Sequence, residues 1–247
     1  MFDRQSGAFT VQLHTTTKFR SASLVKLLIA LDFLWNRGPD YAVPAADKPR
    51  LDIMLRSSDD TAATALWKAN GQRDVVTRMV SRLGLRETAP PPAAQPGFWG
   101  YTALSAADLV RIYRYLLERA PAPVRDYIMG NLHQSTKCGT DRYDQSFGIP
   151  SAFAKPWAAK QGWSGFGDKP ANPCTANAST TTSEPHFIPA AGILSGDVLH
   201  TTGTVGGGDR AIVVVLTQHP DGGGYSKAFS AVTKLTRALN VPGATPA

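Results

Sequence analysis

The stretch TTTKFRSASLVKLLIALDFLW, residues 15–35, decides how the rest of this sequence is interpreted. A polar, basic lead-in is followed by small residues and then by a segment that is apolar on nearly all sides, which predicts a central, buried helix over residues 22–36. Ser23 and Lys26 stand one helical turn apart, on the same face of that helix. Either Lys26 activates Ser23, or it is a solvated lysine that happens to follow a serine.

A serine followed by a lysine at this spacing suits nucleophilic catalysis. A serine hydroxyl is a poor nucleophile at neutral pH and needs an adjacent base. A lysine can be that base when burial and neighbouring cations lower its pKa, and a helix N-terminus directs its positive dipole end at a developing oxyanion. The spacing alone arises easily by chance. An idle charge inside an apolar helix is costly, however, so the position of Lys26 favours a specific partner.

The composition is that of a globular protein with a basic surface. The 247 residues are long enough to bury a core, and 43% are hydrophobic and 18% charged. The net charge of +7 comes from scattered Lys and Arg without a dense run, so we expect no nucleic-acid partner. An affinity for acidic polymers such as cell-wall polyanions is the alternative. The longest apolar run, residues 24–35, contains Lys26 and Asp32 and is too short and too charged to span a membrane.

The sequence starts abruptly at Met1, within a region that has strand character. FDRQSGAFTVQL, residues 2–13, has the pattern of strand, turn and strand, and this chain contains no basic region followed by an apolar stretch that would form a signal peptide. We expect an upstream strand or an export signal in the full-length protein, which would then be secreted or held in the cell envelope.

Cysteine and histidine usage is sparse. Cys138 and Cys174 either form a disulfide, which would indicate an oxidising compartment, or are two unrelated buried thiols. The histidines are isolated from one another and match no metal-ligand spacing, so we expect no metal site and no cofactor.

The order of the expected elements predicts an α+β fold. Strands are expected at residues 7–14 and 157–164, and GDVLHTTGTVGGGDRAIVVVLTQH, residues 196–219, predicts two strands joined at the turn GGGD. Helices are expected at 22–36, 58–71, 72–83, 105–119, 122–132 and 224–240. Irregular loops are expected at the proline-rich residues 88–99 and at 165–195. Such a chain most simply forms an antiparallel sheet with strands from both ends, flanked by helices and packed beside an all-helical lobe.

Two further short motifs follow the first along the chain. Ser58-Asp59-Asp60 lies in SSDDTAATALW, although Ser and Asp are also what a helix start favours. Lys160-Gln161-Gly162-Trp163 lies on the predicted strand AAKQGWSGF, where a lysine before a glycine bulge is the alternative reading.

In this order, FRSASLVKLLIAL, SSDDTAATALW and AKQGWSGF resemble the active-site motifs Ser-x-x-Lys, Ser-Asp-Asn and Lys-Thr-Gly of the penicillin-recognising serine hydrolases, which include class A β-lactamases and D-alanyl-D-alanine carboxypeptidases. The resemblance runs from about Phe2 to Val241 and is strongest to actinobacterial-type serine hydrolases with Lys-Asn-Gly-Trp or Lys-Gln-Gly-Trp as the third motif. It implies one β-lactamase/transpeptidase-like domain over residues 1–247, with an α/β part at 1–22 and 150–247 and a helical part at 23–149.

The resemblance also implies a role for each motif residue. Ser23 would attack a carbonyl and be acylated, and Lys26 would take its proton. Ser58 would relay a proton to the leaving nitrogen, while Lys160 would support that relay and attract the substrate carboxylate. The backbone N–H groups of Ser23 and Trp163 would form the oxyanion hole. The substrate-binding residues implied are Asp60, Gln161, Gly162 and Trp163, and Asp59 would hold its loop by hydrogen bonds to backbone.

Two substitutions depart from the family pattern. Asp60 stands where the family has Asn, and a carboxylate only accepts hydrogen bonds where an amide both donates and accepts. An ionised Asp60 would hold Lys26 protonated and weaken it as a base. Gln161 replaces a Thr or Ser whose hydroxyl binds the substrate carboxylate; its longer amide either replaces that contact or fills the site.

The glutamates predict slow deacylation. Class A β-lactamases activate the deacylating water with a glutamate between the second and third motifs, and this chain has three glutamates in all. Glu118 is late in a helix, Glu184 follows the third motif, and Glu87 comes earlier than expected. We therefore expect a long-lived acyl-enzyme, which argues against an efficient β-lactamase.

The leading hypothesis is a serine hydrolase that acts on an amide or peptide bond through an acyl-serine intermediate. Its substrate would be a β-lactam-like small molecule or a D-alanyl-type peptidoglycan peptide, and the protein would be a monomer. The alternative, motivated by Asp60 and Gln161, is a binding protein that kept the fold and lost the chemistry.

Overall fold

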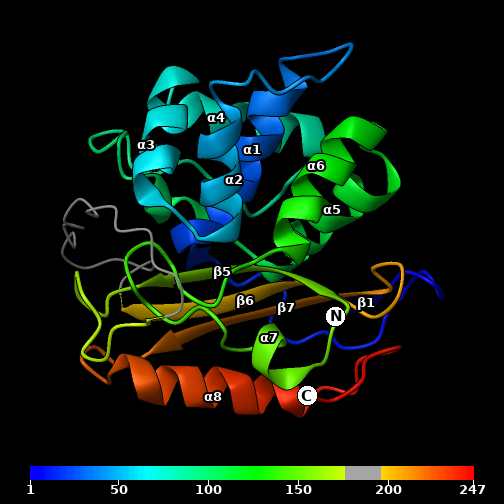
Figure 1. Ribbon diagram of the computed structural model, residues 1–247, viewed down its shortest axis with the longest axis vertical. Coiled ribbons are helices and arrows are strands. Elements are labelled where there is room, and N and C mark those ends of the chain that lie inside the picture. The colour runs from blue at the N-terminus through cyan, green and yellow to red at the C-terminus, as the bar shows by residue number, and fades with distance from the viewer. Residues whose placement is uncertain (176–195) are drawn as a thin grey trace.

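The central sheet takes its strands from both ends of the chain, as predicted. The computed structural model describes residues 1–175 and 196–247. Five strands form an antiparallel sheet in the order β2-β1-β7-β6-β5 (Figure 1). Their bounds are Phe2–Asp3 for β1, Ala8–Phe9 for β2, Trp157–Ser164 for β5, Asp197–Val205 for β6 and Ala211–His219 for β7. The N-terminal strand β1 pairs with β7, so that Phe2 lies opposite Ile212.

The strand predictions were confirmed except at one end. β5 coincides with the predicted residues 157–164, and β6 and β7 form the predicted hairpin. The prediction for residues 7–14 was wrong beyond Phe9, where the pairing stops. Val11 and Leu13 are exposed, so the weak apolar alternation there does not reflect a buried face.

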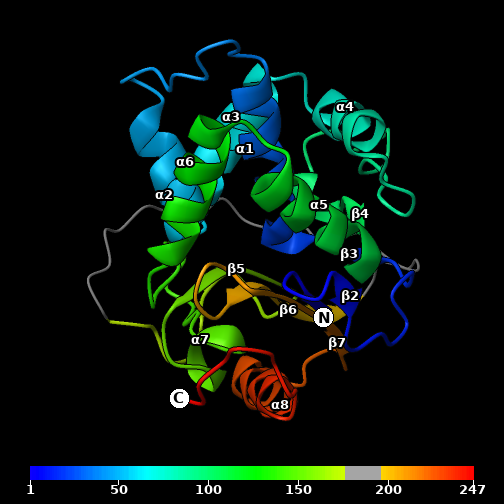
Figure 2. The ribbon, with the colours of Figure 1, turned by 90° about the vertical axis from the view of Figure 1, so that its right-hand side faces the viewer.

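Helices cover both faces of the sheet, with a helical lobe on one face and α8 on the other (Figures 1 and 2). The helices are α1 Lys26–Trp35, α2 Lys48–Arg56, α3 Asp60–Ala69, α4 Arg73–Leu83, α5 Ala106–Glu118, α6 Ala122–His133, α7 Ile149–Ala152 and α8 Tyr225–Arg237. Two 3₁₀ helices, η1 Ala22–Val25 and η2 Trp99–Tyr101, and a small two-stranded sheet of β3 Phe19–Arg20 with β4 Ala103–Leu104 complete the described elements. Helices α2 and α7 were not predicted, and none of the described helices is long and apolar enough to cross a membrane.

The helix α1 lies at the centre of the lobe, as its apolar sequence predicts. All of its residues from Lys26 to Leu34 are buried. The one acid among them, Asp32, is fully buried and accepts hydrogen bonds from Arg78 at 2.9 and 2.6 Å and from Arg82 at 3.3 Å. These arginines come from α4, so a buried charge is paired across two helices rather than left idle.

The two cysteines form a disulfide, which decides between the alternatives left open by the sequence. Cys138 and Cys174 are joined with their Cα atoms 5.6 Å apart. The bond closes the loop that follows α6 onto the segment after β5. Glu184 and residues 176–195 of the predicted loop lie outside the described residues.

His133, the last residue of α6, joins the helical lobe to the sheet. Its Nδ1 donates to the Trp157 carbonyl at 2.9 Å, and its Nε2 lies 3.1 Å from Oδ1 of Asp209 in the turn between β6 and β7. Because Nδ1 already carries a proton, donation by Nε2 requires the imidazolium form. The hydrogen bond to Asp209 therefore raises the pKa of His133.

We expect the His133→Gln variant to lose stability at acidic but not at alkaline pH. A raised folded-state pKa means that the stabilisation is complete below about pH 6.5 and is lost as the pH rises through the higher folded-state pKa. The side chain is 35% exposed, so solvent screening limits the loss to roughly 0.5 kcal/mol. Urea unfolding at pH 5.5 and 9 measures it, with the exposed His14→Gln as a matched control. An equal loss at both pH values would contradict the ion pair.

Candidate active site

Ser23 lies in η1, directly before α1, in a backbone that is bent into an unusual conformation. Ala22 has φ of 45° and Ser58, in the second motif, has φ of 58°, both in the left-handed region that non-glycine residues rarely adopt. Such conformations cost on the order of 1 kcal/mol each and tend to occur at functional sites. One strained position directly precedes Ser23, and the other is Ser58 itself.

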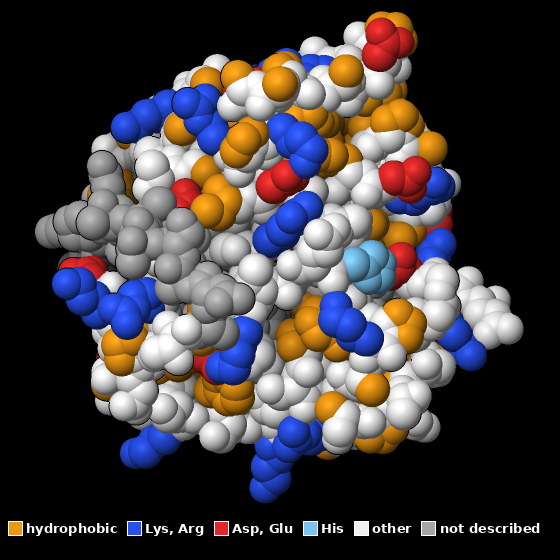
Figure 3. All heavy atoms as spheres, in the orientation of Figure 1, with side chains coloured by type: hydrophobic (Ala, Val, Ile, Leu, Met, Phe, Trp, Pro, Cys, Tyr) orange, Lys and Arg blue, Asp and Glu red, His pale blue; other side chains and the backbone are white. Residues whose placement is uncertain are grey.

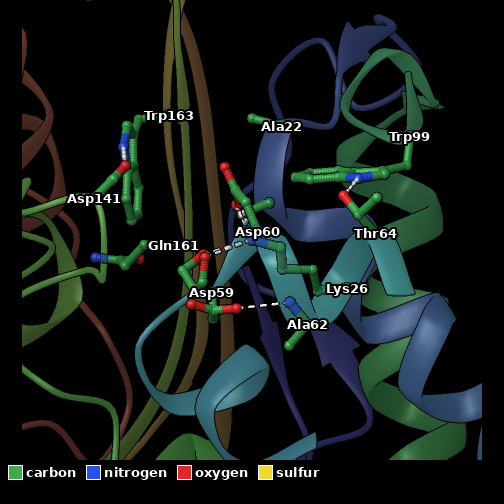
Figure 4. A network of polar contacts seen from close by, with 12 residues as sticks. Ala22, Lys26, Asp59, Asp60, Ala62, Thr64, Trp99, Asp141, Gln161 and Trp163 are labelled. Atoms are coloured by element: carbon green, nitrogen blue, oxygen red, sulfur yellow. Dashed lines mark hydrogen bonds and ion pairs between the residues drawn. The ribbon is translucent and has the colours of Figure 1, made fainter. Parts of the chain in front are cut away.

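Lys26 is fully buried and contacts Ser23 directly. Its Nζ lies 2.9 Å from Ser23 Oγ, 2.6 Å from the Ser58 carbonyl oxygen and 2.5 Å from Oδ1 of Asp60. These three short contacts match the three N–H donors of an ammonium group. Figure 4 shows Lys26 reaching Asp60 from α1. The lysine is therefore no solvated residue, and in this arrangement it is paired with a carboxylate.

Lys160 extends the network from the other side of Ser58. Its Nζ donates to Ser58 Oγ at 2.8 Å, and Lys26 Nζ lies 3.3 Å from the same oxygen. Lys160 is 1% exposed, and burial together with the positive charge of Lys26 lowers its pKa well below the usual range. The structure thus connects Ser23, Lys26, Ser58 and Lys160 by hydrogen bonds.

Gly162 explains how strand β5 and Ser23 come together. β5 is the edge strand of the sheet and packs against η1. A Cβ at Gly162 would lie 3.0 Å from the Ser21 carbonyl oxygen and 3.4 Å from the Ser23 nitrogen, so a larger residue would push the strand away. The absence of a side chain lets the backbone of Gly162 lie beside the Ser23 N–H.

Gln161 is placed differently from the other motif residues. Its side chain is fully buried, and its Nε2 donates to the carbonyls of Phe147 at 2.5 Å and Gln145 at 3.1 Å. It does not line the cavity described below. The sequence left two alternatives, that the amide replaces the missing hydroxyl or that it fills the site. In the structure the amide does neither, because it donates to backbone carbonyls of the loop at residues 145–147.

Asp59 acts as the N-cap of α3. Its carboxylate accepts a hydrogen bond from the Ala62 N–H at 2.6 Å (Figure 4). This fixes the backbone on which Ser58 and Asp60 sit. The helix-start reading of the second motif therefore holds for Asp59, while its two neighbours contact the lysines.

Ser23 opens onto a cavity of about 720 Å³. Six aromatic side chains line it: Phe98, Trp99, Tyr101, Tyr143, Trp163 and Phe166. The charged residues of the lining are Asp60, Asp141, Asp168 and Lys68. The cavity is large enough for a small molecule or a few residues of a peptide.

Trp99 lines the cavity but was not singled out by the sequence analysis. It belongs to η2, at the end of the segment predicted to be an irregular proline-rich loop. Its ring centroid lies 4.8 Å from Lys26 Nζ, and its Nε1 donates to Thr64 Oγ1 at 3.1 Å (Figure 4). The indole thereby covers the catalytic-motif lysine on this side and contributes a cation–π contact.

Asp141 also lines the cavity and was not singled out by the sequence analysis. Its carboxylate accepts hydrogen bonds from Trp163 Nε1 at 2.8 Å and from the Tyr143 N–H at 3.1 Å. The loop that carries it is held by the disulfide at Cys138 and by the Thr140 N–H, which donates to the Ser57 carbonyl at 3.0 Å. Desolvation raises the pKa of Asp141 to about 6, and the negative charge of Asp60 adds to the effect.

We expect the Asp141→Asn variant to be more stable than the parent at pH 7.5. A carboxyl whose pKa rises from 3.8 to about 6 on folding destabilises the fold increasingly as the pH rises from about 4 to 6. Two pKa units correspond to about 3 kcal/mol, and the single oxygen of Asn loses one hydrogen bond worth about 1 kcal/mol. Measured by urea unfolding, the expected net gain is about 2 kcal/mol at pH 7.5, whereas at pH 4 only the lost hydrogen bond remains and the variant is about 1 kcal/mol less stable than the parent.

The exposed Asp126→Asn is the control for this prediction, because it removes the same charge outside the cavity. A gain of equal size at both pH values, or none at pH 7.5, would show that Asp141 is not held as a destabilising carboxylate.

Sequence comparison finds relatives in two mycobacterial species and no matching family model. The chain is 41% identical over 168 residues to proteins named "Putative lipoprotein LppW" in Mycobacterium tuberculosis and Mycobacterium bovis. The match includes 66% of this chain and 52% of each relative, so the chain spans about half the length of the curated relatives it matches.

Structure comparison finds solved proteins that share nearly the whole architecture. The class A β-lactamase of Mycobacterium abscessus aligns with a TM-score of 0.62 at 18% identity, covering 96% of this chain and 89% of that one. The β-lactamase of Streptomyces albus G gives 0.62 at 19% identity, covering 97% and 92%. PBP-A gives 0.65 at 16% identity, covering 96% and 85%. Likeness at this level of identity concerns the fold, and the predicted α+β, β-lactamase-like fold is confirmed.

Proposed function

We propose that this chain, which has the fold of the penicillin-recognising serine hydrolases, is a serine hydrolase that cleaves an amide or peptide bond through an acyl-Ser23 intermediate. The observation that carries the proposal is the 2.9 Å contact between Lys26 Nζ and Ser23 Oγ at the edge of the cavity. A buried lysine in contact with a serine hydroxyl is the arrangement that activates such a nucleophile.

In the proposed acylation, Ser23 Oγ bonds to the carbonyl carbon as its proton passes to Lys26 in the free-base form. The resulting oxyanion accepts hydrogen bonds from the backbone N–H groups of Ser23 and Trp163. The C–N bond then breaks, and Ser58 Oγ gives its proton to the leaving nitrogen. The proton that Lys26 took from Ser23 then passes to Ser58 across their 3.3 Å contact, and Lys160 supports this relay through its 2.8 Å hydrogen bond to Ser58 Oγ.

We expect slow deacylation because the carboxylates near Ser23 are engaged by other groups and the described glutamates lie outside the cavity lining. Among the described residues that line the cavity there is no glutamate. Glu87 pairs with Lys18 at 3.3 Å, and Glu118 pairs with Arg114 at 3.1 Å. Asp60 is engaged by Lys26 and Asp141 by the Trp163 indole, and neither Glu87 nor Glu118 lines the cavity, where it could activate water at the acyl-enzyme.

The proposed substrates are β-lactam-like small molecules or D-alanyl-type peptides of the cell envelope. Export of the full-length protein is part of the proposal. It is supported by the lipoprotein name of the mycobacterial relatives and by the Cys138–Cys174 disulfide, since such bonds persist in oxidising compartments.

A binding protein without catalysis is the second candidate function. The ion pair between Lys26 and Asp60 favours it, because an ammonium that is held by a carboxylate has no lone pair to take the Ser23 proton. In that case the cavity would bind the same ligands reversibly.

Labelling with a fluorescent penicillin separates the two functions. The hydrolase predicts a band that survives a denaturing gel and persists for hours after excess unlabelled penicillin is added. Reversible binding in solution with no covalent band would support the binding protein. Rapid loss of the band with steady penicillin consumption would contradict slow deacylation.

A further inference from the structure

The ionisable groups that face the cavity are mostly acidic, although the chain as a whole carries a net charge of +7. Lys and Arg are dispersed over the surface, and the face in Figure 3 shows them spread rather than gathered. The lining itself contains three carboxylates and one cation: Asp60, Asp141, Asp168 and Lys68. Lys68 is exposed near the end of α3, where water screens its charge.

The cations that could hold a substrate carboxylate are already engaged. Lys160 is 1% exposed, and its Nζ donates to Ser58 Oγ and to the Gln161 carbonyl at 3.2 Å. Lys26 is fully buried and paired with Asp60. Arg20 is also buried and donates to the carbonyls of Ser164 at 3.1 Å and Gly196. None of these three residues lines the cavity.

The side of the cavity next to Trp163 instead presents a carboxylate. The Thr140 N–H donates to the Ser57 carbonyl at 3.0 Å, so the loop with Asp141 lies beside Ser58, which protonates the leaving nitrogen in the proposed reaction. Asp141 lies there, held by the Trp163 indole, and it is partly buried, so its charge is less screened than that of a surface acid. The aromatic faces of Tyr143 and Trp163 adjoin it. A carboxylate beside aromatic rings attracts cations and polar hydrogens and repels anions.

We propose that this cavity selects substrates that carry an amide or an ammonium group, rather than a free carboxylate, on the leaving side of the scissile bond. The inference rests on the proposed acyl-Ser23 function and specifies its substrate class. The selecting residue is Asp141, which acts on the leaving group by charge and takes no part in bond making.

Three thioesters with the same benzoylglycyl acyl group test this. Their leaving groups are mercaptoacetate, mercaptoacetamide and thiocholine, which carry a negative, a neutral and a positive group; the quaternary ammonium of thiocholine cannot attack the thioester. The rate of Ser23 acylation is divided by the rate of hydroxide hydrolysis for each thioester, which corrects for intrinsic reactivity. We expect the amide and the ammonium thioesters to acylate at least about tenfold faster than the carboxylate, the size of effect that one partly buried charge exerts at short range.

In the Asp141→Asn variant, the corrected acylation rate of the carboxylate thioester should come to within about threefold of that of the amide thioester. The Asp126→Asn variant, which removes an exposed charge outside the cavity, should keep the tenfold difference between these rates. A carboxylate thioester that reacts fastest, or a gap that Asp141→Asn does not narrow, would overturn this inference and leave the acyl-enzyme function intact. If no thioester acylates the parent above the Ser23→Ala background, the proposed function fails and the inference with it.

Discussion

Replacement of Lys26 by methionine is expected to slow acylation of Ser23 by about a thousandfold or more, the size of effect seen when the base beside a serine nucleophile is removed. Methionine keeps the volume of the buried side chain but has no nitrogen at 2.9 Å from Ser23 Oγ to take the proton. The rate of covalent labelling measures the effect.

Folding must be separated from chemistry in this variant, because Lys26→Met leaves Asp60 without its cation. Circular dichroism and urea unfolding establish whether the variant is folded, and the exposed Lys234→Met on α8 is the control for loss of one positive charge. A folded Lys26→Met protein that is labelled at the parental rate would show that Lys26 is not the base.

The Asp60→Asn variant is expected to accelerate acylation by about tenfold or more. In the parent, the 2.5 Å ion pair holds Lys26 as an ammonium group, and this pairing must be broken before the lysine can accept a proton. Breaking a short, partly buried ion pair costs at least about 1.4 kcal/mol, which is a factor of ten in rate. An amide can still accept a hydrogen bond from Lys26 and removes the charge that stabilises its protonated form.

The acylation rate of Asp60→Asn is compared with that of Asp126→Asn at the same pH. An acylation rate that is unchanged or lower would contradict the explanation that the Asp60 carboxylate weakens Lys26 as a base. It would then favour a role for Asp60 in holding the lysine against Ser23.

The parts of the fold that the sequence predicted are those with strong local signals. The helix with Ser23 and Lys26 is apolar on all sides, and the hairpin has a glycine cluster between two β-branched runs. The helix α2 was missed because KPRLDIMLR begins with a proline in its first turn and buries only three residues, Leu51, Met54 and Leu55. A pattern that short does not establish a helical period.

The motifs predicted which residues come together in the site, but not the direction of every side chain. Ser23, Lys26, Ser58 and Lys160 converge, because the motif spacing follows from helix geometry and from strand β5 at the sheet edge. The side-chain direction of Gln161 was not predictable, since it depends on backbone carbonyls in the loop at residues 145–147.

Trp99 and Asp141 were missed for a related reason. Both reach the cavity from loops whose paths depend on long-range contacts. The disulfide between Cys138 and Cys174 holds the loop that carries Asp141, so the position of this residue could not be predicted before the partner of Cys138 was known.

Intact-mass spectrometry after incubation with benzylpenicillin, and in parallel with its methyl ester, which lacks the carboxylate, tests the central claim most directly. The account predicts a persistent adduct of one whole β-lactam on the parent protein with at least the ester, and no adduct on Ser23→Ala. A parent protein without any adduct, in a solution where neither compound is consumed, would contradict the activation of Ser23 by Lys26 and would favour the binding protein.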